Sequence, residues 1–218
     1  MKPSGVIYRL GRSPAPWAAP DWAWAGRDGT FNNRFDDPLA FYRVLYASSQ
    51  RLGCFLETLA RFRLDLKLIA EFAEIQGEDD HVPLGEVPVE WLENRMMGSA
   101  SADGEYADIC SSDWISRLRV LLWVDLLRFG IEDLDASILQ KTAPRILTQS
   151  VSRIVFNDGL AGIRYLSRHG HDIENWALFE PFQINVLETE PIRQDDPDLQ
   201  HALQLHSLKF RGKASMNI

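Results

Sequence analysis

NNRFDDPLAFYRVLYASSQRLGCFLETLARFR, residues 32–63, sets a turn, a strand and a helix in immediate succession. Two asparagines, two aspartates and a proline within residues 32–38 predict a tight turn around Arg34, because these residue types bond their own backbone or fix φ. Residues 42–47 are rich in aromatic and β-branched side chains that alternate between two faces, which predicts a short strand with Tyr46 near its end. An arginine and a tyrosine thus come directly before the helix.

The helix is predicted to begin immediately after this strand, with Ser48 or Ser49 as its N-cap. Its apolar residues recur at the i, i+3, i+4, i+7 spacing of a buried stripe, and they are Leu52, Phe55, Leu56 and Leu59. Glu57 lies on the flank of that stripe. A carboxylate at the margin of a buried face is costly to desolvate unless a positive or hydrogen-bonding group meets it. We expect such a partner close by in the sequence.

Length and charge limit the classes of protein to which the chain can belong. With 218 residues, 45% of them hydrophobic, the chain can bury the core of one domain, with or without an appendage. Its formal net charge of −8 argues against a broad nucleic-acid surface, because such binding neutralises many phosphates with lysine and arginine. We therefore expect no direct nucleic-acid binding, although a single nucleotide needs only a few local cations.

The spacing of cysteines and histidines gives no support to a metal site. Cys54 and Cys110 are too few and too far apart for a disulfide framework or a C-x-x-C site. His169 and His171 have the spacing of one strand face rather than of a helical zinc pair, and no third ligand stands near them in the sequence. A Rossmann site has no support either, because no G-x-G-x-x-G motif follows a predicted strand.

The sequence predicts neither export nor membrane insertion. Residues 1–12 lack the apolar core of a signal peptide. The most apolar run, residues 120–127, is interrupted by Asp125 and is far shorter than a membrane span. We therefore expect a cytoplasmic protein without membrane contact.

Strands are predicted near both ends of the chain and helices between them. A first strand at residues 5–10 precedes a segment rich in proline and tryptophan, residues 14–27, which we expect to be an ordered loop packed on the body. Residues 76–88 predict a surface loop, and residues 98–104, which are small or polar almost throughout, predict a mobile one. The segregation of strands and helices indicates an α+β fold with mainly antiparallel pairing.

One helix in the middle of the chain is predicted to be deeply packed. Ser112 or Asp113 can cap it, and Gly130 can end it. Trp123 and Val124 widen its apolar face, so we expect both side chains to be buried.

Several separated blocks of the sequence, in order, resemble the RES domain, a family named for an arginine, a glutamate and a serine that its members share. The blocks are IYRLGR, NRFDDP, YRVLYAS, FLETLARF and GIRYLSRHGHDIENWALFE. The first block carries Arg9, and the last carries Ser167 followed by Asn175. The resemblance implies that residues 5–182 form a RES domain and that residues 183–218 form a C-terminal extension.

The resemblance also implies a fold like that of ADP-ribosyltransferases, in which split antiparallel sheets surrounded by helices form a cleft for NAD. NAD would be the substrate, and no metal would take part. Arg9 and Arg34 would bind its pyrophosphate, because a guanidinium bonds phosphate oxygens in pairs and stays charged. Tyr46 would offer an aromatic face to the nicotinamide. The alternatives are core packing for Tyr46 and, for the arginines, surface ion pairs with Asp21, Asp36 or Asp37.

Three polar residues would serve the ribose. Glu57 would stabilise the positive charge that builds there when the glycosidic bond breaks, whereas without the resemblance a helix glutamate is expected to be a solvated surface residue. Ser167 would orient Glu57 or contact the ribose, the alternative being a turn residue before Arg168. Asn175 would bond the ligand or a backbone group.

By resemblance, the chain is an NAD-consuming toxin of a toxin–antitoxin pair. Phosphate, water or a protein side chain could accept the ADP-ribosyl group, and the sequence leaves that choice open. The expected partner is an antitoxin with a helix-turn-helix domain, and the sequence also leaves open whether the chain forms a homodimer. A second hypothesis is a binding or regulatory module that keeps the nucleotide cleft without turnover, against which the presence of the arginines, Glu57 and Ser167 speaks.

Overall fold

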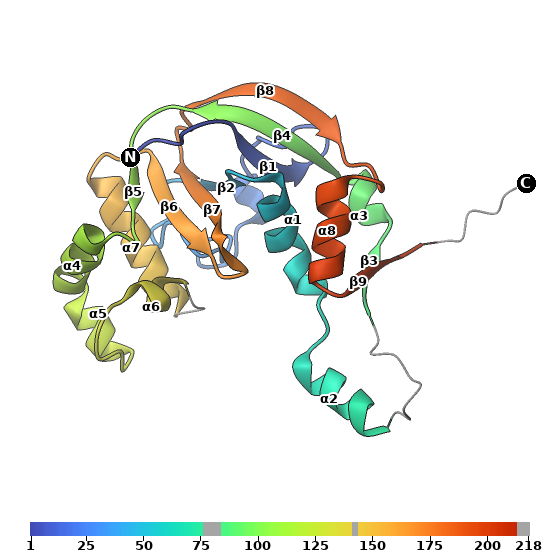
Figure 1. The fold of residues 1–218 in the computed structure, drawn as a ribbon. Coiled ribbons are helices and arrows are strands. Elements are labelled where there is room, and N and C mark those ends of the chain that lie inside the picture. The colour runs from blue at the N-terminus through green and yellow to red at the C-terminus, as the bar shows by residue number, and fades with distance from the viewer. Residues whose placement is uncertain (76–83, 141–143, 213–218) are drawn as a thin grey trace, which may run out of the picture.

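The computed structural model describes residues 1–75, 84–140 and 144–212, which form an α+β fold (Figure 1). The described residues build a seven-stranded sheet in the order β5-β6-β7-β2-β1-β4-β8. Every pair in it is antiparallel except β5 with β6, so the prediction of an α+β fold with mainly antiparallel pairing is confirmed. Its strands are β1 (Ile7–Arg12), β2 (Val44–Ser48), β4 (Arg95–Ala102), β5 (Tyr106–Asp108), β6 (Gly162–Ser167), β7 (Gly170–Phe179) and β8 (Ile184–Pro191). A separate parallel pair joins β3 (Gly85–Pro88) to β9 (Leu208–Arg211).

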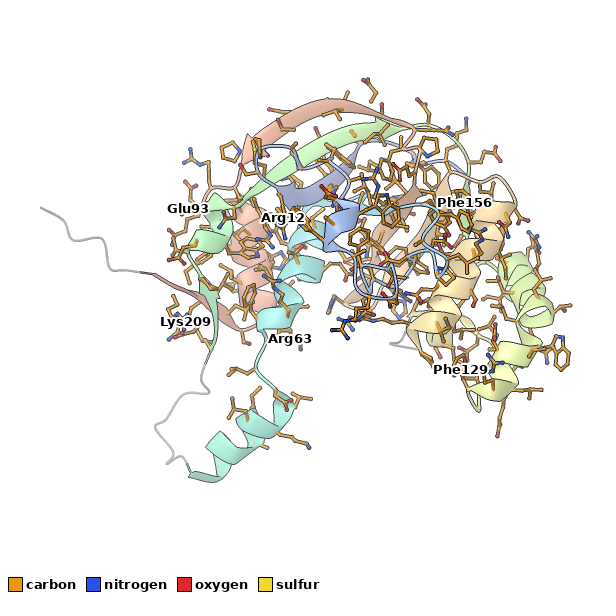
Figure 2. All side chains as sticks on the ribbon, turned by 180° about the vertical axis from the view of Figure 1, so that it is seen from behind. Arg12, Arg63, Glu93, Phe129, Phe156 and Lys209 are labelled. Carbon is orange, nitrogen blue, oxygen red and sulfur yellow. The ribbon has the colours of Figure 1, made fainter. Side chains whose placement is uncertain are left out.

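The helices gather in two groups beside this sheet. One group lies against β5, β6 and β7 and comprises α4 (Ser112–Leu121), α5 (Trp123–Arg128), α6 (Ala136–Gln140) and α7 (Arg145–Asn157). On the other side, α1 (Arg51–Leu59) lies against α8 (Pro197–Leu205), near α3 (Glu90–Glu93). Figure 2 shows from behind that Phe129 and Phe156 mark the first group and Glu93 and Lys209 the opposite side. Helix α2 (Leu66–Ile75) projects away from the body (Figure 1).

The large sheet splits in its middle. Within the described chain, β1 and β2 are paired at Tyr8 and Ser48 alone, whereas β1 pairs with β4 along its whole length. The halves β5-β6-β7-β2 and β1-β4-β8 therefore diverge, as expected for split antiparallel sheets surrounded by helices. Each half carries its own core: Leu147 and Val151 of α7 are buried with the first, and Phe55 of α1 with the second.

The central turn, strand and helix follow the prediction closely, except at the N-cap. The N-cap is Gln50, whose side chain makes no capping hydrogen bond. The Ser49 hydroxyl instead donates to Glu174 Oε2 (2.6 Å) and accepts from Trp176 Nε1 (2.8 Å), both on β7. The prediction of a serine cap was wrong because the serines bond a neighbouring strand that the local sequence cannot show.

Residues 98–104 were wrongly predicted to be a mobile loop. Most of them belong to β4, which is paired on both sides, with β1 and with β8. Small residues are needed there because the tryptophan-rich loop packs on the strand: a Cβ at Gly98 would lie 2.4 Å from Trp17 Nε1. Trp17 is buried, so the expectation of an ordered loop is confirmed at this point.

The helix predicted from Ser112 to Gly130 is two helices, α4 and α5, with Ser111 as the N-cap of the first. Trp123 is 60% exposed and Val124 is 50% exposed, so the prediction that they are deeply packed was wrong. Both residues lie at the start of α5.

The chain beyond residue 182 is built onto the body. Strand β8 extends the large sheet, and α8 buries Leu199, Ala202 and Leu203 in the core that α1 shares. The boundary at residue 182 stays a prediction. Of the loop predicted at residues 76–88, residues 85–88 form β3 and residues 76–83 lie outside the described residues. In the described part of the chain, no helix has the length and apolar character that crossing a membrane requires.

Candidate functional site

A cavity of about 410 Å³ lies where β1 and β2 diverge. Arg9 from β1, Tyr46 from β2 and Glu57 from α1 all line it. So do Arg34, from the turn before β2, and Asn175, from β7. Ser167 lies outside this lining, but its hydroxyl reaches Glu57. The fold thus brings together all six residues singled out in the sequence.

Arg9 joins three segments at the edge of the cavity. Its Nε donates to the carbonyl of Pro16 (2.8 Å) and its Nη1 to the carbonyl of Tyr46 (2.7 Å). Burial lowers its pKa to about 10, so the guanidinium keeps its charge at neutral pH. Arg9 therefore fixes the tryptophan-rich loop and β2 to β1 while placing a positive charge beside the cavity.

Arg34 is the cavity's unsatisfied cation. Its Nε and Nη2 are buried and have no hydrogen-bond partner among the described residues. Its guanidinium carbon lies 5.1 Å and 5.2 Å from the ring centroids of Phe35 and Tyr165. Burial lowers the pKa of Arg34, because a cation without an acceptor is costly to desolvate. An anion entering the cavity would supply the missing acceptors.

Tyr46 fixes the turn that carries Arg34. Its hydroxyl accepts from the backbone N–H of Phe35 (2.9 Å) and donates to Asp36 Oδ1 (3.5 Å). Asp36 in turn accepts from the backbone N–H of Asn33 (2.7 Å). Tyr46 is half-buried and lines the cavity, so it combines a packing role with access to a ligand.

Glu57 is held at one carboxylate oxygen. Oε1 accepts from the Ser167 hydroxyl (2.7 Å) and from Asn175 Nδ2 (2.9 Å). The side chain is 35% exposed, and its other oxygen, Oε2, lies 3.9 Å from His169 Nε2. The partners were expected close by in the sequence, which was wrong: they come from β6 and β7, more than a hundred residues away. Pairing of those strands, rather than local sequence, provides them.

Sequence reasoning missed several further side chains that line the cavity, among them Tyr165, Arg145 and Arg168. Tyr165 lies two residues before Ser167 in β6, so strand alternation would have placed both side chains on one face. Its hydroxyl is buried, which raises its pKa. Arg145, at the start of α7, donates to the carbonyl of Asn32. No local signal distinguishes this arginine from a surface residue.

The cavity is positively charged although the chain is acidic. Its lining carries the four arginines named above and one carboxylate, Glu57. Such a site favours a small anionic ligand over an extended polyanion. The described residues hold no group of histidine, cysteine and carboxylate side chains suited to a metal ion.

Comparisons with known proteins agree with this architecture. The sequence model of a family described as RES domain matches residues 6–200. The chain is also similar to one in the crystal structure of the M. tuberculosis MbcT–MbcA toxin–antitoxin complex, with a TM-score of 0.54 and 11% sequence identity. That similarity covers 94% of this chain and 91% of the other, and at this identity it shows the fold alone. No curated protein sequence matches the chain.

Proposed function

The chain belongs to the RES domain family, and from this premise we propose that it consumes NAD by breaking the bond between nicotinamide and ribose. The observation that carries the proposal is the presence, in one cavity, of a carboxylate held by two donors and an arginine with two buried nitrogens that have no hydrogen-bond partner among the described residues. NAD requires both: an anion site for its pyrophosphate and a negative charge near the ribose. The cavity volume falls within the range of about 300–1,000 Å³ usual for small-molecule sites.

Arg34 is the proposed centre of the pyrophosphate site. Its two free N–H groups can bond phosphate oxygens without first breaking a bond within the protein. Arg9 adds charge, although two of its nitrogens are already committed to main-chain carbonyls. The aromatic rings of Tyr46 and Tyr165 are the surfaces on which the nicotinamide would rest.

Glu57 is the proposed catalytic residue. As the C1′–N bond breaks, nicotinamide leaves with the bonding electrons and the ribose develops positive charge, which a nearby carboxylate stabilises. Ser167 and Asn175 hold Oε1, so Oε2 is the oxygen left to face the ribose. An oxygen of the acceptor then bonds C1′. Phosphate, water and a protein side chain remain the three candidate acceptors.

We also propose that the chain is the toxin of a toxin–antitoxin pair. Support comes from the family and from the fold shared with a chain of a toxin–antitoxin complex. The proposed partner is an antitoxin with a helix-turn-helix domain that places a carboxylate on Arg34 and Arg9. Such a contact competes with the pyrophosphate for the same donors.

The test is incubation of the purified protein with NAD, with and without phosphate, followed by identification of the products. Wild-type protein should release nicotinamide. Glu57→Gln should fold normally and lose turnover by a factor of about 10² to 10³, the usual cost of removing one preorganised electrostatic group. Glu90→Gln, at an exposed glutamate of α3, is the matched control. Near-normal NAD consumption by a folded Glu57→Gln protein refutes the role of Glu57, and inactivity of the wild type favours the binding-module hypothesis.

A further inference from the structure

His169 contacts both members of the Glu57–Ser167 pair. Its backbone N–H donates to Ser167 Oγ (3.0 Å), which leaves the serine proton for Glu57 Oε1. Its ring places Nε2 3.9 Å from Glu57 Oε2, the carboxylate oxygen that Ser167 and Asn175 do not hold. The His169 side chain is 9% exposed, so it is a fixed neighbour of the carboxylate rather than a loose surface group.

The hydrogen bonds around the ring define a neutral histidine. Arg168 Nε lies 3.4 Å from His169 Nε2, and because an arginine only donates, Nε2 is the acceptor and carries no proton. The ring centroids of His206 and His169 lie 5.3 Å apart. His206 Nε2 lies 3.0 Å from the Leu56 carbonyl oxygen. A carbonyl only accepts, so His206 keeps its own proton on that nitrogen. His169 Nε2 and Glu57 Oε2 are then both acceptors, so the two groups do not hydrogen-bond to each other.

We propose that His169 is a positioning residue for Glu57: the neutral ring leaves Oε2 free to face the substrate, and the protonated ring pairs with Oε2 and withdraws it. The inference rests on the proposed function, since it treats Oε2 of Glu57 as the oxygen that meets the ribose. Protonation places an N–H on Nε2, which ends the contact with Arg168 Nε, and a small movement of the His169 or Glu57 side chain then closes the 3.9 Å gap into an ion pair.

Burial and the charged groups around His169 determine the direction in which its pKa is shifted. Burial lowers its pKa below the ordinary value of 6.5, and Arg168, His206 and Arg63 lower it further, whereas the Glu57 carboxylate raises it. Arg63 follows the short turn after α1 (Figure 2), and His206 follows α8. His169 is therefore neutral at neutral pH. As the pH falls below neutral, the ring becomes protonated and Glu57 Oε2 is no longer free to face the substrate.

The first measurement does not depend on activity. An NMR titration of the His169 ring, identified by the loss of its signal in His169→Gln, gives its pKa in the wild type and in Glu57→Gln. The proposal requires a lower pKa in Glu57→Gln, because the carboxylate that favours the protonated ring is gone. An unchanged pKa would show that the two side chains are not coupled and would overturn the proposal.

The second measurement is the pH dependence of kcat/KM for NAD consumption. Wild-type kcat/KM should fall about tenfold per pH unit below the pKa of His169, and His169→Gln should lack this decline down to about pH 5. His171→Gln, at an exposed histidine two residues away, should keep it. A decline retained by folded His169→Gln would overturn the proposal. Wild-type protein that consumes no NAD would refute the proposed function instead, and the titration would still decide whether His169 is coupled to Glu57.

Discussion

Arg34 illustrates how a single residue can be costly to the fold and useful to the site. Two of its nitrogens are buried without acceptors, and a buried unsatisfied donor costs about 1–3 kcal/mol. The turn keeps this arginine in place through Tyr46 and Asp36. A ligand that supplies the missing acceptors offsets this cost, because hydrogen bonds made by charged groups are stronger than those between neutral groups.

Arg34→Ala should therefore weaken NAD binding without weakening the fold. Loss of charge-assisted bonds worth about 1.5–3 kcal/mol corresponds to roughly 10- to 150-fold in Kd, while the melting temperature should stay the same or rise. Calorimetric titration with NAD and thermal unfolding measure the two effects. Arg193→Ala, at an exposed arginine paired with Asp195, is the control. If Arg34→Ala melts early and binds NAD normally, Arg34 is a structural residue.

At the same scale, the sequence singled out six candidate site residues that the fold gathers around one cavity, but it did not indicate the partners of Glu57. Resemblance singled out Glu57, Ser167 and Asn175, yet local reasoning looked for the partner of Glu57 near it in the chain. The hydrogen bonds to Glu57 depend on the pairing of β6 with β7 and on the position of α1 beside them. Those are long-range contacts, and periodicity within one segment carries no information about them.

Among the elements, those with a clear pattern were predicted and those shaped by their neighbours were not. The strand predicted at residues 42–47 is observed at Val44–Ser48, and the helix predicted to follow it is observed at Arg51–Leu59, because their apolar side chains follow periods of two and 3.6. Strand β4 was missed because its Gly98 and the small residues that follow read as a loop. At Gly98 a larger side chain is excluded because Trp17 and Pro16 of the tryptophan-rich loop lie directly on the strand.

Gly98→Ala should consequently disturb the site from a distance. Its Cβ would meet Trp17 at 2.4 Å and Pro16 Cγ at 2.9 Å, and the Pro16 carbonyl is one of the acceptors that hold Arg9. Overpacking of this kind costs about 1–3 kcal/mol. We expect a lower melting temperature and weaker NAD binding together, measured by thermal unfolding and calorimetry. Gly5→Ala, where an added Cβ meets nothing within 4 Å, should change neither. A stable Gly98→Ala protein with normal affinity would show that this loop does not position Arg9.

For the whole molecule, the end of the described chain supports the helix that carries Glu57. Arg51, at the start of α1, forms ion pairs with Glu190 of β8, with Asp196, which is the N-cap of α8, and with Asp198 of α8. The resemblance assigned residues 183–218 to a C-terminal extension, and β8 within them is an edge strand with mostly exposed side chains. Half-exposed edge strands lack the continuous apolar run by which a buried strand is recognised.

The charge distribution of the whole molecule bears on its cellular role. The chain has a net charge of −8, yet four arginines surround the cavity, so an anionic ligand is attracted to the cavity rather than to the general surface. NAD fits that description, and every cell needs NAD. If the protein consumes NAD as proposed, free protein should be harmful, and an inhibitor that occupies the cavity should relieve the harm.

Expression of the wild-type chain alone in a bacterial host should thus lower cellular NAD and arrest growth. Co-expression with the product of the adjacent gene should restore both, and truncating the carboxylate-bearing segment of that partner should abolish the rescue. The binding free energy lost on truncation should exceed the roughly 0.2–1 kcal/mol of an exposed ion pair, because two nitrogens of Arg34 are buried and have no hydrogen-bond partner among the described residues. Glu57→Gln, expressed to the same level, is the control that separates NAD loss from the burden of expression. Normal growth and normal NAD in cells that contain folded wild-type protein would refute the toxin proposal, whereas arrest by Glu57→Gln as well would point to harm through binding rather than catalysis.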